Sequence, residues 1–193
     1  MAADSERLFM ALPLPAAATE AIERWREPLA AGLTGMHWER PERMHVTLAF
    51  LGDMPPGRVP RLIAATSSAL APLRLGSARL GAPGGFPALR DPHTIWIGVE
   101  CDDGWIERVQ AALASALTRC GVVPDHRPFR SHVTVGRLHR GATHRERRAI
   151  GAALTRGSPP SPVTWIADRV VLYNSLLGGE APRYVEVAAF EVL

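Results

Sequence analysis

The sequence contains an internal repeat, and this repeat restricts the fold more than any other feature. When the chain is shifted against itself by 87 residues, RPERMHVT at 40–47 aligns with RPFRSHVT at 127–134, and six of the eight positions are identical. Upstream at the same offset, the apolar run at 8–12 falls on the run at 95–99, and both are typical of buried strands. We therefore expect the chain to fold into two similar halves.

Hydrophobic periodicity predicts a mixture of strands and helices in each half. The repeat units, about 7–51 and 94–138, are each interpreted as a strand, a helix and a second strand that carries His-Val-Thr. The full prediction places strands at 7–12, 36–39, 45–51, 73–80, 94–100, 132–138, 163–175 and 184–192, helices at 16–31 (with Pro28 as a kink or early stop), 59–70, 105–120 and 144–154, and a Gly/Pro loop at 81–87.

The expected fold class is α+β and bilobal. We expect two mainly antiparallel sheets with outer helices, related by pseudo-two-fold symmetry, and an active cleft between the lobes. The length of 193 residues suits one domain, and we see no linker long enough to divide the chain. The prediction is a single bilobal domain over residues 1–193.

The basic residues exclude several kinds of chemistry. All 22 are arginine, against 19 acidic residues, and the formal net charge is +3. Without lysine there is no lysine nucleophile, no Schiff base and no phosphate loop ending in Gly-Lys-Ser/Thr. A ligase that carries its nucleotide on a lysine is excluded for the same reason. No apolar run approaches the roughly 20 residues of a membrane helix, so we expect no membrane association.

The cysteines and the start of the chain indicate the compartment. Cys101 and Cys120 have no metal-binding spacing, and two cysteines do not make a disulfide scaffold. The early apolar run follows Asp4 and Glu6 and lacks the positively charged segment of a secretory leader. We expect a first core strand there, in a cytoplasmic protein.

Each repeat presents a histidine and a threonine together. Residues i and i+2 of a strand point to the same face, so His45 emerges with Thr47, and His132 emerges with Thr134. If the two halves pack with near two-fold symmetry, these four side chains meet across one cleft. They are the candidate catalytic and phosphate-binding groups.

Two histidines on opposite sides of a phosphate can cleave a phosphodiester without a metal. A neutral imidazole can remove a proton from water, and an imidazolium can protonate the departing oxygen, because the ordinary histidine pKa is about 6.5. Threonine hydroxyls and arginine can bind the phosphate oxygens. The symmetry of the motifs leaves open which histidine is the acid. Because one imidazole must be charged and the other neutral, we expect a bell-shaped pH profile.

At these residues the sequence resembles the 2H phosphoesterase superfamily, and within it the RNA 2′,3′-cyclic phosphodiesterases, also called 2′-5′ RNA ligases. The resemblance covers nearly the whole chain. It rests on four blocks in family order: HVTLAFLGD at 45–53, GGFP at 84–87, RPFRSHVTVGRL at 127–138 and VLYNS at 171–175.

The resemblance implies a cyclic phosphodiesterase that needs no metal and no cofactor. The implied reaction hydrolyses a terminal 2′,3′-cyclic phosphate of an RNA or nucleotide to a 2′-phosphomonoester. In the family pattern His45 is the proton donor and His132 the proton acceptor, and Thr47, Thr134 and Arg137 bind the phosphate.

Arg137 poses a geometric problem, because its odd spacing from His132 would point it to the wrong face of a regular strand. Gly136 predicts a bulge or bend there. Phe50 occupies the equivalent position of the other repeat, so phosphate binding is expected to be one-sided. Arg130 is a candidate for the rim of the cleft, whereas Arg43 is better explained as a solvated arginine.

Two other functions remain open at this stage. The same site can run in reverse and join RNA ends through a 2′-5′ bond without ATP, although water in large excess favours hydrolysis. The chain can alternatively be a non-catalytic RNA-binding module, which the intact pair of motifs disfavours. We expect a monomer without an obligatory protein partner. Five aromatic residues are candidates to stack on a base: Phe50, Phe86, Trp96, Tyr173 and Tyr184.

Overall fold

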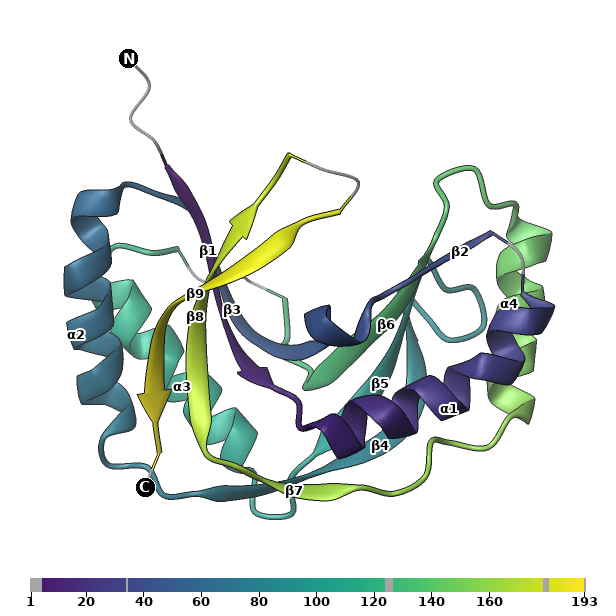
Figure 1. The fold of residues 1–193 in the computed structure, drawn as a ribbon, viewed down its shortest axis with the longest axis horizontal. Coiled ribbons are helices and arrows are strands. Elements are labelled where there is room, and N and C mark those ends of the chain that lie inside the picture. Colours follow the sequence, from purple (N-terminus) through teal and green to yellow (C-terminus); the bar gives the residue numbers. More distant parts are fainter. Residues whose placement is uncertain (1–4, 34, 124–126, 179–180, 193) are drawn as a thin grey trace.

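The computed structural model describes residues 5–33, 35–123, 127–178 and 181–192 (Figure 1). Its strands are β1 (Glu6–Pro13), β2 (Met36–Trp38), β3 (His45–Met54), β4 (Gly76–Phe86), β5 (Thr94–Glu100), β6 (His132–Leu138), β7 (Thr164–Ala167), β8 (Arg169–Leu176) and β9 (Arg183–Glu191). Its helices are α1 (Ala16–Gly32), α2 (Val59–Leu70), α3 (Trp105–Arg119) and α4 (His144–Arg156), with 3-10 turns η1 (Pro41–Arg43) and η2 (Pro56–Arg58).

All these strands belong to one curled antiparallel sheet. Its order is β7-β4-β5-β6-β3-β1-β8-β9, and β2 pairs with the open part of β6. The two halves join where Val46 of β3 lies opposite Val133 of β6. The α+β bilobal class is confirmed, and the two expected sheets are the halves of one continuous sheet. Pairing at the junction satisfies backbone groups that two separate sheets would leave open at their inner edges.

The helices cover one face of the sheet and close the core there. Val46 and Val133 are both fully buried on this face. Apolar residues of every helix join the same core, among them Ile22 of α1, Leu62 of α2, Leu113 of α3 and Ile150 of α4. The motif side chains alternate with the two valines, so they project from the opposite face, which the helices leave uncovered.

The first helix of each repeat packs on the half built by the other repeat. α3 follows β5 in the chain but contacts β3, and it lies beside α2 in the half that contains β1 (Figure 1). α1 follows β1 but reaches the segment just after α4. There the indole Nε1 of Trp25 donates to the carbonyl of Ser158 at 2.9 Å. This exchange ties the two halves into one core.

Two expected loop and strand boundaries are wrong. β4 continues through the predicted loop at 81–87 as far as Phe86, because its glycines admit large side chains of the neighbouring strand. A Cβ on Gly84 would lie 2.1 Å from the Trp96 ring. The strand predicted at 163–175 is two strands that separate at Asp168, with β7 on β4 and β8 on β1. The segment 163–175 therefore crosses from one half of the molecule to the other.

Pro28 neither ends nor shortens α1, which continues to Gly32. Pro28 is exposed, so the carbonyl that loses its partner four residues earlier can be hydrated instead. The other helices begin and end within two residues of the positions that periodicity predicted.

Candidate active site

The four motif side chains surround the junction of the two halves. His45 and Thr47 flank Val46 on β3, and His132 and Thr134 flank Val133 on β6. All four are partly exposed on the face opposite the two buried valines. The antiparallel register sets each histidine across from the threonine of the other motif. The structure thus brings the predicted catalytic and threonine residues together.

A bulge in β6 directs Arg137 toward the same face. Thr134 and Gly136 lie opposite consecutive residues of β5, so Val135 is an extra residue in the pairing. One extra residue reverses the facing of the residues that follow it. The irregularity predicted at Gly136 is therefore present, and it overcomes the odd spacing of Arg137 from His132.

β3 contains the same bulge, with Leu48 as the extra residue between Thr47 and Ala49. It brings Phe50 to the site face, where this side chain is 60% exposed. Phe50 and Arg137 are thus equivalent in structure as well as in the repeat. The two halves present an apolar ring and a guanidinium at matching places.

The expected alignment of the first strands is wrong by two residues. Ala11 of β1 lies opposite Thr47, and Trp96 of β5 lies opposite Thr134. These positions are 85 residues apart, not 87. A shift of two residues preserves the face of every side chain, because the strand period is two. The alignment error therefore left the site prediction intact.

Both histidines make the same backbone hydrogen bond. Nδ1 of His45 lies 2.7 Å from the carbonyl oxygen of Arg43, and Nδ1 of His132 lies 2.7 Å from that of Arg130. A carbonyl only accepts, so Nδ1 carries the hydrogen in each ring. Nε2 is then the atom that gains or loses a proton, and it remains available for a ligand.

Two aromatic rings hold each imidazole. Around His45 the ring centroids of Phe9 and Tyr184 lie at 5.0 and 5.4 Å. Around His132 those of Phe86 and Trp96 lie at 5.0 and 5.7 Å. Three of these rings were sequence candidates for base stacking, but here they pack on the histidines. Phe9 was missed, because it lies in an apolar run that predicts only core packing.

Burial lowers the pKa of both histidines below the ordinary value of 6.5. For His45 the bond to the Arg43 carbonyl and the negative charge of Glu39 oppose this shift, whereas the charges of Arg137 and His132 add to it. For His132 the bond to the Arg130 carbonyl opposes the shift in the same way, whereas the nearby cations Arg130 and Arg137 both lower its pKa further. The two imidazoles therefore lie in different fields.

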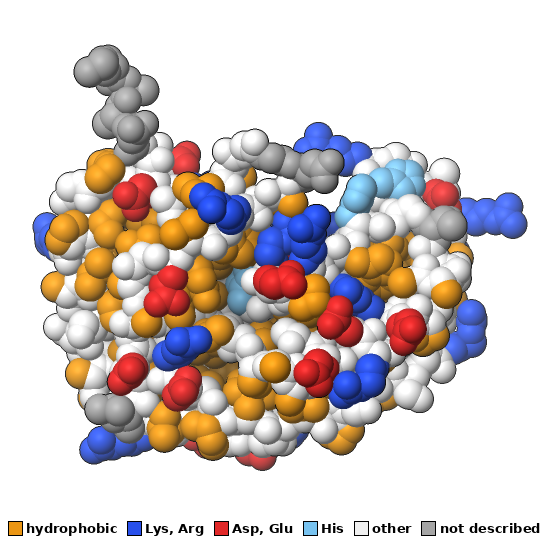
Figure 2. Space-filling view, viewed as in Figure 1, with side chains coloured by type: hydrophobic (Ala, Val, Ile, Leu, Met, Phe, Trp, Pro, Cys, Tyr) orange, Lys and Arg blue, Asp and Glu red, His pale blue; other side chains and the backbone are white. Residues whose placement is uncertain are grey.

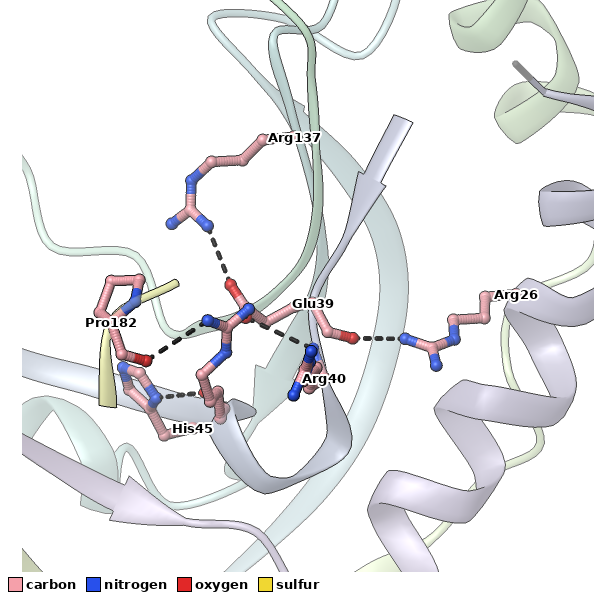
Figure 3. A network of polar contacts seen from close by, with 7 residues as sticks. Arg26, Glu39, Arg40, His45, Arg137 and Pro182 are labelled. Carbon is pink, nitrogen blue, oxygen red and sulfur yellow. Dashed lines mark hydrogen bonds and ion pairs between the residues drawn. The ribbon is translucent and has the colours of Figure 1, made fainter. Parts of the chain in front are cut away.

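Glu39 connects the two halves beside the site (Figure 3). Its carboxylate pairs with Arg137 at 3.0 Å and with Arg43, and its side chain is only 11% exposed. Arg43 is itself largely buried, so the expectation of a solvated arginine is wrong. In the space-filling view a recessed histidine is visible in the middle of this face, beside basic and acidic side chains (Figure 2).

Arg130 is exposed next to the site, and its guanidinium lies 5.4 Å from the centroid of the Trp96 ring. This position suits the rim that the sequence suggested. Glu39 is the charged residue that sequence reasoning missed. The repeat shows only that the two halves differ there, because position 126, which aligns with Glu39, is a histidine. His126 lies outside the described residues.

Comparison with known proteins identifies the family. A model described as LigT like Phosphoesterase matches the chain twice, over residues 12–96 and 97–184, in agreement with the internal repeat. The chain belongs to this family. The resemblance to 2H phosphoesterases found in the sequence is thereby confirmed, and so is the prediction that the protein is an enzyme of the phosphoesterase class.

Relatives with assigned names span the same region. The chain is 31% identical over 188 residues to an RNA 2′,3′-cyclic phosphodiesterase of Geobacillus stearothermophilus, covering 96% of this chain and 57% of that relative. It thus spans little more than half of that relative's length. It is 30% identical over 186 residues to a protein of the same name from Archaeoglobus fulgidus, covering 96% of this chain and 99% of the relative.

Solved structures support the fold. The crystal structure of E. coli LigT complexed with 3′-AMP matches with a TM-score of 0.77 at 23% identity, covering 98% of this chain and 99% of that one. The crystal structure of TT0787 of Thermus thermophilus matches with a TM-score of 0.74 at 23% identity, covering 96% and 97%. These likenesses confirm the duplicated two-lobe fold.

The described part of the chain contains neither a membrane-spanning helix nor a cluster of metal-binding side chains. Within residues 5–33, 35–123, 127–178 and 181–192, no helix is long and apolar enough to cross a membrane. In the same ranges His, Cys, Asp and Glu form no group of three or more that could hold a metal ion.

Proposed function

We propose that this protein is an RNA 2′,3′-cyclic phosphodiesterase that hydrolyses a terminal 2′,3′-cyclic phosphate to a 2′-phosphomonoester by metal-free two-histidine catalysis. The observation that carries the proposal is the junction at Val46 and Val133. It sets two imidazoles, each bonded through Nδ1 to a backbone carbonyl, beside each other on one face of the sheet. The names of the relatives from Geobacillus stearothermophilus and Archaeoglobus fulgidus support the same substrate class.

In the proposed reaction, water attacks the phosphorus while Nε2 of neutral His132 removes its proton. The bond between phosphorus and the 3′ oxygen breaks, and Nε2–H of protonated His45 donates its proton to that oxygen. Help of this kind from one group contributes about 10²–10⁴-fold. Protonated His132 then releases its proton to solvent and His45 takes one up, so both rings return to their starting protonation states.

Three further side chains bind the phosphate in this proposal. The hydroxyls of Thr47 and Thr134 donate to its non-bridging oxygens. The Arg137 guanidinium stabilises the charge that develops on them, and at 57% exposure it is accessible to a ligand. Because Phe50 stands at the equivalent place, the charge stabilisation comes from one side.

The assignment of acid to His45 and base to His132 agrees with their surroundings. Arg137 disfavours the charged form of both rings, but Glu39 opposes it at His45, whereas Arg130 adds to it at His132. The family pattern implies the same roles.

The test is turnover of a nucleoside 2′,3′-cyclic phosphate with and without EDTA, followed by ³¹P NMR of the product. We expect a 2′-phosphate, unaffected by the chelator. His144→Ala is the matched control for variants of His45 and His132, because it removes an exposed histidine of α4 that lies outside the site. No turnover, a 3′-phosphate product, or activity that EDTA abolishes and a divalent metal restores would each contradict the proposal.

A cyclic-ended oligonucleotide mixed with an oligonucleotide bearing a 5′-hydroxyl separates hydrolysis from ligation. Both reactions use the same groups, because in ligation the 5′-hydroxyl takes the place of water as the nucleophile that attacks the cyclic phosphate and again displaces the 3′ oxygen. We expect the hydrolysed 2′-phosphate as the main product, since water is in excess. Net accumulation of joined RNA would favour the ligase instead.

A further inference from the structure

Glu39 is fixed from several sides at the junction of the two halves. Its backbone N–H donates to the carbonyl of Val135, the extra residue of the β6 bulge, at 2.9 Å. Its backbone carbonyl accepts from the guanidinium of Arg26 in α1 (Figure 3). These two bonds fix the backbone of Glu39, so its side chain is anchored to the segment of β6 that directs Arg137 into the site.

The carboxylate lies between two arginines from different halves. One oxygen pairs with Nη1 of Arg137 at 3.0 Å, and the other pairs with Arg43. Arg43 in turn donates to the carbonyl of Pro182, just before β9, at 3.4 Å. Arg137 remains 57% exposed, so the rest of its guanidinium is open to a ligand. An arginine held in this way loses less conformational entropy when it binds a phosphate.

Glu39 also makes the charges around the two histidines unequal. The groups that face His45 are Glu39 after β2, Arg137 and His132 on β6, and the ring of Tyr184 on β9. The Arg43 carbonyl from η1 bonds its Nδ1. Of these, Glu39 is negative. The charges that act on His132 are those of Arg130 and Arg137, and both are positive.

We propose that Glu39 is a positioning residue of this site: it orients Arg137 for the phosphate and supplies the negative charge that distinguishes the surroundings of His45 from those of His132. The inference rests on the proposed hydrolysis for its catalytic meaning. Glu39 acts through its neighbours and does not touch the reacting atoms. Its partner Arg137 belongs to the other repeat, so one carboxylate couples the two halves.

Glu39→Gln is the informative variant, because it removes the charge and keeps an oxygen that can accept from Arg137. The acid must be protonated, so the high-pH limb of kcat/KM follows His45. Loss of the negative charge moves that limb to lower pH and leaves the low-pH limb, which follows His132, in place. Looser placement of Arg137 lowers kcat/KM at the optimum by about 10- to 100-fold.

The experiment compares three variants by pH profile of kcat/KM on a nucleoside 2′,3′-cyclic phosphate, by NMR titration of the histidine rings, and by thermal unfolding. Glu39→Gln tests the charge, Glu39→Asp keeps it with a shorter reach, and Glu42→Gln is the control. Glu42 lies in η1, close in sequence, and is exposed.

We expect Glu39→Gln to shift the high-pH limb and the His45 titration to lower pH, Glu39→Asp to preserve both positions, and Glu42→Gln to behave as wild type. An unchanged profile with an unchanged KM overturns the inference. So does a uniform loss at every pH that parallels a loss of thermal stability and occurs equally in Glu39→Asp. The ring titration needs no turnover, so an inactive wild type would refute the proposed hydrolysis and still leave the influence of Glu39 on His45 measurable.

Discussion

The half around His45 and the half around His132 are alike in backbone and different in charge. Each imidazole bonds the carbonyl two residues before it at 2.7 Å, and each follows the same strand pattern with a bulge after its threonine. The charged neighbours differ: Arg137 acts on both rings, but the carboxylate of Glu39 acts on His45 and the guanidinium of Arg130 acts on His132. Duplication thus sets the positions of the two imidazoles, whereas residues outside the motifs set the charges around them.

The largest expected effect comes from the two histidines. His45→Ala and His132→Ala are each expected to lower kcat by about 10²–10⁴-fold, because each removes one proton transfer. The pH dependence of the residual activity distinguishes the two histidines. His132→Ala is expected to lose the low-pH limb of the profile, and His45→Ala the high-pH limb. Steady-state kinetics from pH 5 to 9 measure both. Loss of the same limb in both variants would break the comparison.

The second effect concerns the equivalent positions 137 and 50. Arg137→Met is expected to lower kcat by about 100-fold, as for the loss of one group that stabilises the developing charge. Phe50→Leu is expected to cost less than about 10-fold, because it removes an exposed ring and no charge. Kinetics on a cyclic mononucleotide measure both variants. Equal losses would mean that phosphate binding is not one-sided.

The two threonines are expected to contribute about equally. Thr47→Val and Thr134→Val each remove one hydroxyl donor to a charged phosphate, worth about 10-fold in kcat/KM. The measurement is kcat/KM with circular dichroism as a check of folding. If one variant keeps full activity, the phosphate is held by one half alone, and the symmetric placement of the hydroxyls has no functional meaning.

The pH optimum is a smaller test of the same comparison. Burial lowers the pKa of both histidines of the free enzyme below 6.5, and kcat/KM reports the free enzyme. We expect its optimum on the acid side of 6.5, and the optimum of kcat at higher pH, because a bound phosphate anion raises the pKa of both rings. A kcat/KM optimum above pH 8 is incompatible with these directions.

The smallest expected effect is on stability. Both histidines have a lower pKa in the folded than in the unfolded state, so the unfolded state binds more protons as the pH falls below about 7. The free energy of unfolding is therefore expected to decrease from pH 7 toward pH 5. Denaturant titrations of His45→Asn and His132→Asn should each give a flatter dependence than the wild type. A wild-type stability that rises toward pH 5 would contradict the burial of these rings.

The motif part of the site was predictable because strand alternation is local. The spacing of His45 from Thr47 fixes their common face whatever the rest of the chain does, and the same holds for the second motif. For this reason the error of two residues in aligning β1 with β5 had no effect on the site. Gly136 likewise signalled the bulge, because a glycine inside a strand often marks one, and in the structure it also leaves room for Met36 of β2, whose Cε would lie 2.7 Å from a Cβ there.

The parts that were not predictable depend on contacts between distant segments. The chain separates at Asp168 into β7 and β8 because two different edge strands are available to pair with them, and periodicity alone predicts one continuous strand. Arg43 was interpreted as solvated because its partner Glu39 and the carbonyl of Pro182 have no signature at its position in the sequence.

The amino-acid sequence determined the duplicated unit, the residues that face the site and the chemistry that two imidazoles permit, because a repeat and a strand period are properties of neighbouring residues. The tertiary structure decided that the halves join at Val46 and Val133, that the helices cross to opposite halves, and that Glu39 pairs with Arg137. These outcomes depend on packing and charge interactions that act only over short distances. Only the folded chain brings residues that are far apart in the sequence within such distances.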